Sequence, residues 1–201
     1  MNIIKFSFLV RVIVVFALIL MTQGCATSFQ DKSVLRTISS IQISENVEMP
    51  KSPTVGGALV FGKHNPEAIG RGANILEKTL EYKGVNFKDL LISISKEKFA
   101  DFSNRLSSNK NGGVGLVEFH VVEYGFVKGW YYTFRPQITI RALMFVDKKL
   151  AFDRSFSVGG YTETYAAPLG GDLPSSEYIK VFSSGIETIL NEMQKSLQQA
   201  L

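Results

Sequence analysis

The stretch QITIRALMFV, residues 137–146, decides the fold of this chain. Its even-numbered residues are all apolar, whereas Gln137, Thr139 and Arg141 between them are polar or charged. Successive side chains of a β-strand point to opposite faces, so this alternation predicts a strand with one face in a core and the other toward solvent.

Segments on both sides of this stretch show the same period of two. The expected inward residues are Val117, Phe119 and Val121 before it, and Leu150, Phe152, Phe156 and Val158 after it; the outward ones are Glu118, His120, Asp153, Ser155 and Ser157. We expect residues 147–149 to form the turn into the last strand and residues 125–136 to form a longer first connection. The three segments therefore predict an antiparallel meander.

Helical spacing appears on either side of these strands. We expect Ser175 or Ser176 to cap the most regular segment, whose apolar residues follow a three-and-four spacing: Ile179, Phe182, Ile186, Ile189, Met193 and Leu197. Asn65, Pro66 and Glu67 are typical of a helix start, and we expect that helix to run to about Tyr82. A further helix is expected over residues 86–106, after a stop at Gly84 and with a break near Ser95.

The remaining segments complete the predicted fold. Residues 34–47 are expected to form a first strand, and residues 50–62, with their prolines and glycines, a loop. The predicted fold class is α+β, with a small, mainly antiparallel sheet of about four strands, helices packed on one face, and the order β-α-α-β-β-β-α. Residues 34–201 form a single domain in this interpretation.

The first 25 residues predict an exported protein. Lys5 and Arg11 precede a ten-residue apolar run, VIVVFALILM at residues 12–21, and small and polar residues follow it. This order is typical of a secretory signal, here residues 1–24. A membrane-spanning helix needs about twenty apolar residues and would have to bury Arg11 here, so it is the weaker interpretation.

The segment MTQGC, residues 21–25, resembles the lipobox of bacterial lipoproteins. The resemblance implies cleavage between Gly24 and Cys25, and attachment to a membrane through acyl chains on Cys25, the only cysteine of the chain. Ala26 follows where such lipoproteins carry Asp when the inner membrane retains them, which implies the outer membrane. Residues 25–33 are expected to form a tether, in which about eight extended residues span about 25 Å.

Composition and motifs exclude several classes of function. The net charge of +4 falls to about +2 without the signal, and basic residues are scattered, so no nucleic-acid partner is expected. Residues 57–64 match a phosphate-loop spacing, but His64 stands where the motif needs Ser or Thr, so no nucleotide is expected. His64 and His120 are the only histidines, and no metal or other cofactor is expected.

Catalysis has little support in this sequence. No Gly-x-Ser-x-Gly elbow is present, and the only thiol is assigned to the anchor. The alternative that remains open is a periplasm-facing hydrolase centred on His120 and Glu118, with Thr139, Arg141, Asp153 or Ser155 on the same sheet face. An ordinary polar strand face explains those residues more simply, so an enzyme is less expected than a binding protein.

The densest aromatic cluster lies in residues 124–135, YGFVKGWYYTFR, at the junction of two predicted strands. The candidate partner-binding residues are Phe126, Trp130, Tyr131, Tyr132 and Phe134, because aromatic rings among cations suit a protein or glycan contact, or a membrane interface. The alternative is a longer hairpin whose rings pack under residues 161–174. In layout alone the domain resembles small envelope lipoproteins that serve as accessory subunits of transport or assembly machines. We therefore expect a non-enzymatic binding or assembly lipoprotein with an envelope protein partner, or alternatively a peptidoglycan-binding one.

Overall fold

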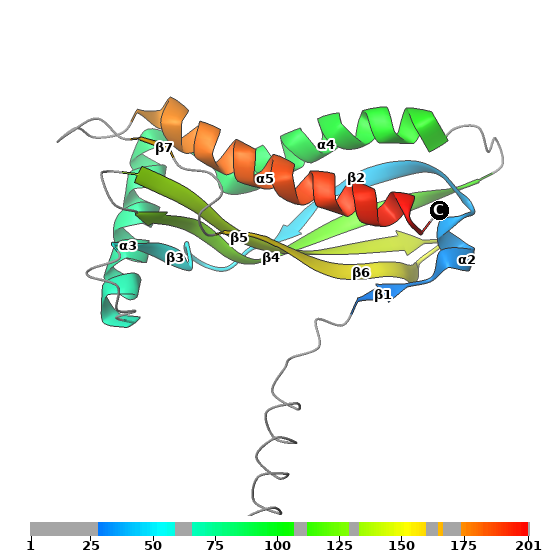
Figure 1. The fold of residues 1–201 in the computed structure, drawn as a ribbon, viewed down its shortest axis with the longest axis horizontal. Coiled ribbons are helices and arrows are strands. Elements are labelled where there is room, and N and C mark those ends of the chain that lie inside the picture. The colour runs from blue at the N-terminus through cyan, green and yellow to red at the C-terminus, as the bar shows by residue number, and fades with distance from the viewer. Residues whose placement is uncertain are drawn as a thin grey trace, which may run out of the picture.

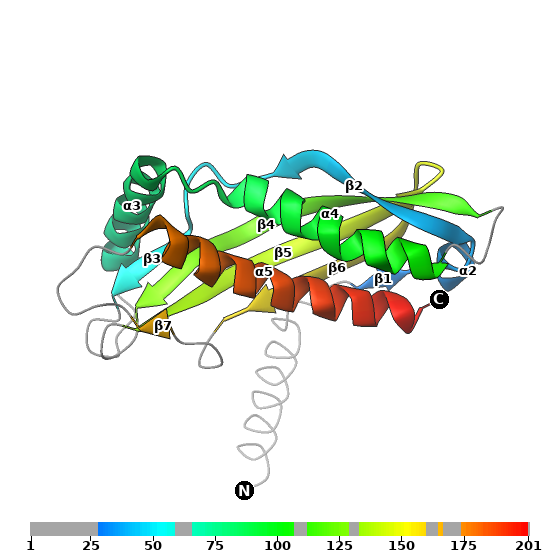
Figure 2. The same ribbon diagram turned by 90° about the horizontal axis from the view of Figure 1, so that it is seen from above.

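The computed structural model describes residues 28–58, 66–106, 112–128, 133–159, 165–166 and 174–200. These residues form one twisted sheet with two long helices on one of its faces (Figures 1 and 2). A third helix stands at one end of the sheet, and a short helix lies at the other end (Figure 1). The α+β class predicted from the sequence is confirmed.

The sheet has more strands than predicted and is mixed. Its main path runs β1 (Phe29–Gln30), β6 (Lys149–Val158), β5 (Thr133–Val146), β4 (Gly113–Lys128) and β2 (Ile38–Glu48). Two short strands lie off this path, β3 (Val55–Ala58) beside β4 and β7 (Tyr165–Ala166) beside β5. The meander β4–β5–β6 is antiparallel as predicted, but β2 and β3 run parallel to β4. Four of the six pairings between the described strands are antiparallel, as a mainly antiparallel sheet requires, but the sheet has more strands than the predicted four or so.

The parallel pairing has a simple cause in the chain order. Two helices, α3 (Pro66–Lys83) and α4 (Phe87–Leu106), lie between β3 and β4, and they provide the long crossover that parallel neighbours require. At the junction of the helices, Gly84 adopts φ +65°. The amide of Val85 donates to the Leu80 carbonyl and the amide of Gly84 to that of Glu81, as in a Schellman motif. The predicted stop at Gly84 is confirmed, whereas α4 continues through Ser95 without the predicted break.

The core lies between the sheet and helices α4 and α5 (Ser175–Gln198). Its largest fully buried side chains come from all of these elements: Leu91, Phe99 and Phe102 on α4, Phe182, Ile186 and Ile189 on α5, and Phe119, Ile138, Ile140, Met144 and Phe152 on the sheet. The predicted apolar stripe of α5 is confirmed except for Ile179, which is 39% exposed. Gly185 lies where α5 crosses β5, close to Ile138 and Pro136.

The domain begins earlier than predicted. Residues expected to form part of the tether instead form β1, which pairs with β6, and α2 (Lys32–Leu35). Asp31 caps α2 by accepting hydrogen bonds from the amides of Ser33 and Val34. Gln30 donates through Nε2 to the Ser196 hydroxyl of α5 at 2.9 Å. The tether predicted over 25–33 is thus wrong from residue 29 onward, and the strand predicted from 34 begins only at Ile38.

Of the three predicted connections, one is confirmed as a turn and two are partly strand. The turn between β5 and β6 is confirmed: Asp147 and Lys148 have φ of 50° and 64°, the left-handed pair that suits a two-residue hairpin turn. The connection predicted over 125–136 is mostly strand, because β4 extends to Lys128 and β5 begins at Thr133. Part of the loop predicted over 50–62 is likewise strand β3.

Candidate functional site

The face of the sheet opposite α4 and α5 carries a band of polar side chains, which we call the polar sheet face. Its members come from β2, β4, β5 and β6: Glu48, His120, Glu123, Gln137, Thr139, Arg141, Asp153 and Ser157. Alternation sends most of their strand neighbours into the core, among them Ile138, Ile140 and Phe156, so these residues share the other side of the sheet. The prediction that Thr139, Arg141 and Asp153 share a polar face with His120 is confirmed.

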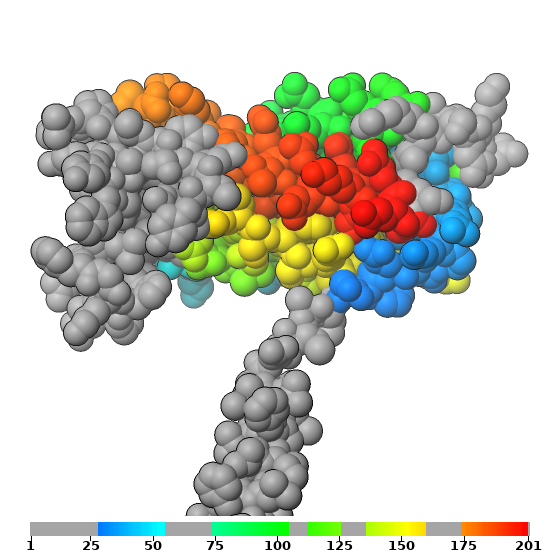
Figure 3. Space-filling view, in the orientation of Figure 1, coloured from blue at the N-terminus to red at the C-terminus, as the bar shows by residue number. Residues whose placement is uncertain are grey.

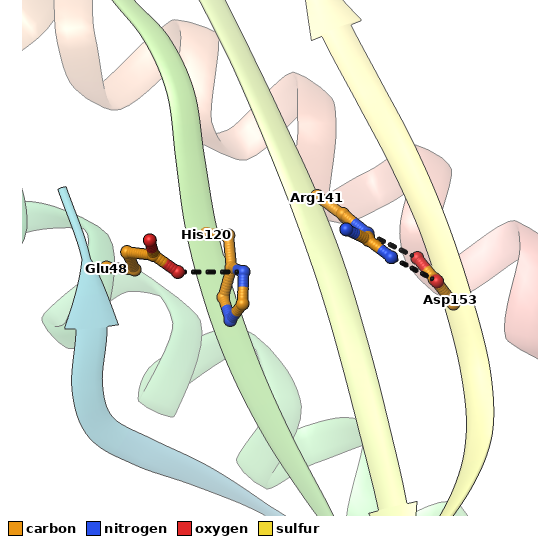
Figure 4. A network of polar contacts seen from close by, with 4 residues as sticks. All are labelled: Glu48, His120, Arg141 and Asp153. Carbon is orange, nitrogen blue, oxygen red and sulfur yellow. Dashed lines mark hydrogen bonds and ion pairs between the residues drawn. The ribbon is translucent and has the colours of Figure 1, made fainter. Parts of the chain in front are cut away.

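Arg141 and Asp153 form a bidentate ion pair between β5 and β6 (Figure 4). Arg141 Nε donates to Asp153 Oδ1 at 2.8 Å, and Arg141 Nη2 donates to Oδ2 at 2.6 Å. The hydrogen bonds from Arg141 lower the pKa of Asp153, and desolvation opposes this only in part. The same contact raises the pKa of Arg141. The aspartate side chain is only 10% exposed, so the pair is a fixed structural element with its charges balanced.

His120 pairs with Glu48 on the neighbouring parallel strand and not with Glu118 (Figure 4). Its Nδ1 lies 3.0 Å from Glu48 Oε2. The Glu48 side chain is 72% exposed. Glu118 lies opposite Leu143 in the register of β4 and β5. The partner of His120 is therefore Glu48, a residue that the hydrolase hypothesis did not include.

A chain of hydrogen bonds links the polar residues at the other end of this face. Gln137 Nε2 donates to Glu123 Oε1 at 3.0 Å, and the Thr139 hydroxyl donates to Glu123 Oε2 at 3.4 Å. The hydroxyls of Thr139 and Ser157 are 3.0 Å apart, so the chain crosses from β4 to β6. Most polar atoms here are paired with one another, an arrangement that favours a stable contact surface over an activated nucleophile.

The described residues form two hollows outside the polar sheet face, each of about 500 Å³. One lies between β2 and α4 and is lined by Ile41, Glu45 and Phe99, among others. The other lies where α3 meets α4, with Phe87 and Tyr124 in its wall. Burial raises the pKa of Tyr124, and the charge of nearby Glu77 adds to the effect. Neither hollow includes His120 or Glu118.

The predicted site residues fall largely outside the part of the chain that the structure describes. The predicted residues outside the described ranges are Gly24, Cys25, Trp130, Tyr131 and Tyr132. Of the aromatic candidates, Phe126 belongs to β4 opposite Pro136, and Phe134 belongs to β5 opposite Lys128. These two residues therefore belong to the paired part of the β4–β5 hairpin.

Among the described residues, no cluster of three or more histidine, cysteine or acidic side chains is arranged to hold a metal ion. No helix in the described ranges is long and apolar enough to cross a membrane. No protein-family model, curated protein or solved structure matches this chain.

Proposed function

We propose that this chain is a lipid-anchored, non-enzymatic binding protein of the bacterial cell envelope. Cys25 carries the acyl chains and holds the protein at the outer membrane, and the distal end of the β4–β5 hairpin binds an envelope protein partner. The signal-like segment, the lipobox resemblance and the position of the only cysteine support the anchor. Two acyl chains on one cysteine hold a protein stably at a bilayer.

The main support for the proposal is the distance between the end of the sheet at β1 and the end of the β4–β5 hairpin. Phe29 on β1 is in register with Asp153, and Asp153 with Leu143 of β5. From Leu143, β5 continues to Phe134, which at about 3.4 Å per residue is about 30 Å. Figure 1 shows β1 and α2 toward one end of the long axis, and α3, β3 and β7 at the other. This separation supports a partner site at the hairpin end, away from the proposed anchor.

Replacing Trp130 and Tyr131 together with alanine tests the partner site. Aromatic anchors of an interface contribute about 2 kcal/mol or more each, so binding of the partner should fall at least about thirtyfold. The partner is captured from detergent-solubilised envelopes by cross-linking to the full-length protein and is quantified by mass spectrometry. The matched control is Tyr82→Ala, because Tyr82 is an exposed aromatic residue on α3, 84% accessible.

Each outcome of this experiment has a clear meaning. Loss of one defined envelope protein in the double variant, with its retention in Tyr82→Ala and unchanged circular dichroism, supports the proposal. Unchanged capture refutes the hairpin as the binding site. Retention on isolated peptidoglycan that is lost in the double variant would replace the protein partner with a glycan. The anchor is tested separately by the mass of the native N-terminal peptide in wild type and Cys25→Ser.

A further inference from the structure

Four basic side chains gather at the end of the domain where the described chain begins. Lys32 and Arg36 belong to α2 and its C-terminal cap, and Lys148 and Lys149 belong to the turn between β5 and β6. All four residues are partly or fully exposed. The segments that carry them are in contact, because the Asp31 amide donates to the Ala151 carbonyl at 2.9 Å. Figure 3 shows the blue surface of this N-terminal segment directly beside the yellow surface of β6.

The acidic residues of these two segments do not neutralise this charge. They are Asp31 and Asp147, two carboxylates against four cations. Asp31 Oδ1 accepts hydrogen bonds from the Ser33 hydroxyl and from two amides of α2. Those bonds lower the pKa of Asp31, and Lys149 adds a smaller effect of the same sign. The segments together therefore carry excess positive charge at neutral pH.

Two partly exposed apolar side chains lie at the same end. Phe29 on β1 is 46% exposed, and Leu150, directly after the basic turn, is 38% exposed. Apolar side chains among lysines and arginines are the composition with which proteins contact the headgroup layer of a membrane. The cations attract anionic headgroups, while the apolar groups lie at the boundary of the acyl chains.

The length of chain before β1 limits how far this end can lie from an acylated Cys25. Only residues 26–28 separate Cys25 from Phe29, and four Cα-to-Cα steps span at most about 14 Å. That maximum is longer than the screening length of about 8–10 Å at physiological salt, so charges at this end of the domain act on the headgroups when the connection is shorter than its full extension. The connection is too short to hold this end of the domain far from the membrane.

We propose that Phe29, Lys32, Arg36, Lys148, Lys149 and Leu150 form an anchor-end patch that binds anionic phospholipid headgroups of the membrane that carries the acyl chains. This inference rests on the proposed acylation of Cys25. The patch lies toward the opposite end of the sheet from Lys128 and Phe134, the last described pair of the hairpin. Contact of the patch with the bilayer directs the hairpin away from the membrane, which gives the proposed partner site its orientation.

Single cysteine labels provide the test. Acylation consumes the thiol of Cys25, the only native cysteine, so one introduced cysteine can be labelled selectively in the full-length acylated protein. The variant Lys148→Cys reports on the patch, and the controls Glu97→Cys and Tyr82→Cys report on α4 and α3, where both residues are exposed. Each labelled protein is reconstituted into phosphatidylcholine vesicles with or without phosphatidylglycerol, and its fluorescence is quenched by a headgroup spin-labelled lipid.

We expect strong quenching at position 148 and little at positions 97 and 82, with the quenching at 148 increased by phosphatidylglycerol. Adding Lys32→Glu and Arg36→Glu should reduce the quenching at 148 to its level in phosphatidylcholine alone. Equal quenching at positions 148 and 97 would refute the proposed contact between the patch and the membrane. Quenching at position 148 that phosphatidylglycerol does not change would refute the proposed binding of anionic headgroups.

Two measurements on the same samples distinguish a wrong patch from a wrong anchor. Flotation of the vesicles shows whether the protein is bound to the membrane, and the mass of the N-terminal peptide shows whether Cys25 is acylated. Protein that floats and is acylated but shows equal quenching contradicts the patch alone. Protein that neither floats nor carries acyl chains contradicts both the anchor and the patch.

Discussion

Replacement of Gly185 with alanine tests how closely helix α5 packs on the sheet. A Cβ atom at this position would lie 2.7 Å from Ile138 Cδ1 and 3.0 Å from Pro136 Cβ. Real side chains do not approach so closely, so α5 or its neighbours must move. Ile138 is fully buried and Pro136 is a rigid ring, so neither side chain can turn toward solvent. We therefore expect the added methyl group to destabilise the protein.

The size of the effect follows from two opposing contributions. Gly→Ala in a helix interior stabilises by about 1 kcal/mol through propensity alone. Forcing a methyl group into a filled core costs about 1–3 kcal/mol, and two contacts at or below 3.0 Å favour the upper part of that range. The expected net loss in the free energy of unfolding is about 1–2 kcal/mol, measured by urea denaturation of the full-length protein. Ser183→Ala, at a half-buried position in the same helix, is the control and should be neutral or slightly stabilising.

A second substitution makes this prediction sharper. Ile138→Val removes Cδ1, the atom nearest to the position of the added methyl group, and by itself should cost about 0.5–1.5 kcal/mol. The double variant should be more stable than the sum of the two single effects by at least about 0.5 kcal/mol, because the valine leaves room for the alanine. A Gly185→Ala protein as stable as wild type, or a strictly additive double variant, would refute the close packing of α5 on β5.

Two further predictions concern polar contacts. Asp153→Asn should cost about 1–2 kcal/mol at neutral pH, because it replaces the charged acceptor of the bidentate bond with Arg141, which is itself half exposed. The folded-state pKa of Asp153 is lowered, so the stability gap to the variant should be complete above the unfolded pKa of about 4 and decrease below it; a gap that grows on acidification would contradict this. Ser103→Ala should cost about 0.5–1 kcal/mol and accelerate hydrogen exchange of the Ile41 amide, since the Ser103 hydroxyl accepts from that amide and donates to the Ile41 carbonyl. An unchanged exchange rate at Ile41 would show that this bond does not protect the edge of β2.

Local patterns in the sequence were sufficient for the long elements of the core. The three-and-four spacing of α5 and the alternation in residues 137–146 each reflect burial on one side, and the structure buries nearly all of those residues as expected. The direction of β2 was not predictable in the same way. Alternation describes the two faces of a strand but not its neighbours, and the pairing of Ile43 with Val117 joins residues on either side of two helices.

The short strands β1 and β3 were not predicted, for a different reason. Strand β3 contains Gly56 and Gly57, which have low strand propensity, and its strand conformation comes from pairing with β4. Strand β1 has two residues, too few to show any period. The signal that was available is Asp31, an N-cap residue followed by Ser33 and the buried Leu35. Tertiary contacts determine such segments, so single-sequence patterns underestimate them.

The same limit applies to the polar sheet face. The period of two correctly placed Arg141 and Asp153 on one face, because Arg141 lies between the core residues Ile140 and Ala142 and Asp153 follows the core residue Phe152. It could not identify Glu48 as the partner of His120, since that pair depends on the register between β2 and β4. In β2 that register shifts between Ile43 and Val47, and a shift of this kind has no signature in the apolar pattern.

The proposed anchor and partner sites constrain each other through the sheet. Strands β4 and β5 run from the turn at Asp147 to the hairpin end, and their antiparallel register is continuous except for one shift after Val121. Such a ladder has little freedom to bend along its length, so the position of one end largely determines that of the other. Leu143 and Phe134 are about 30 Å apart along β5, so Phe134 lies at most about that much farther from the bilayer than Leu143 if the anchor-end patch lies on it. The closer β5 stands to the membrane normal, the farther a partner at the hairpin end must extend from the membrane surface, which favours partners with a folded portion in the aqueous envelope space.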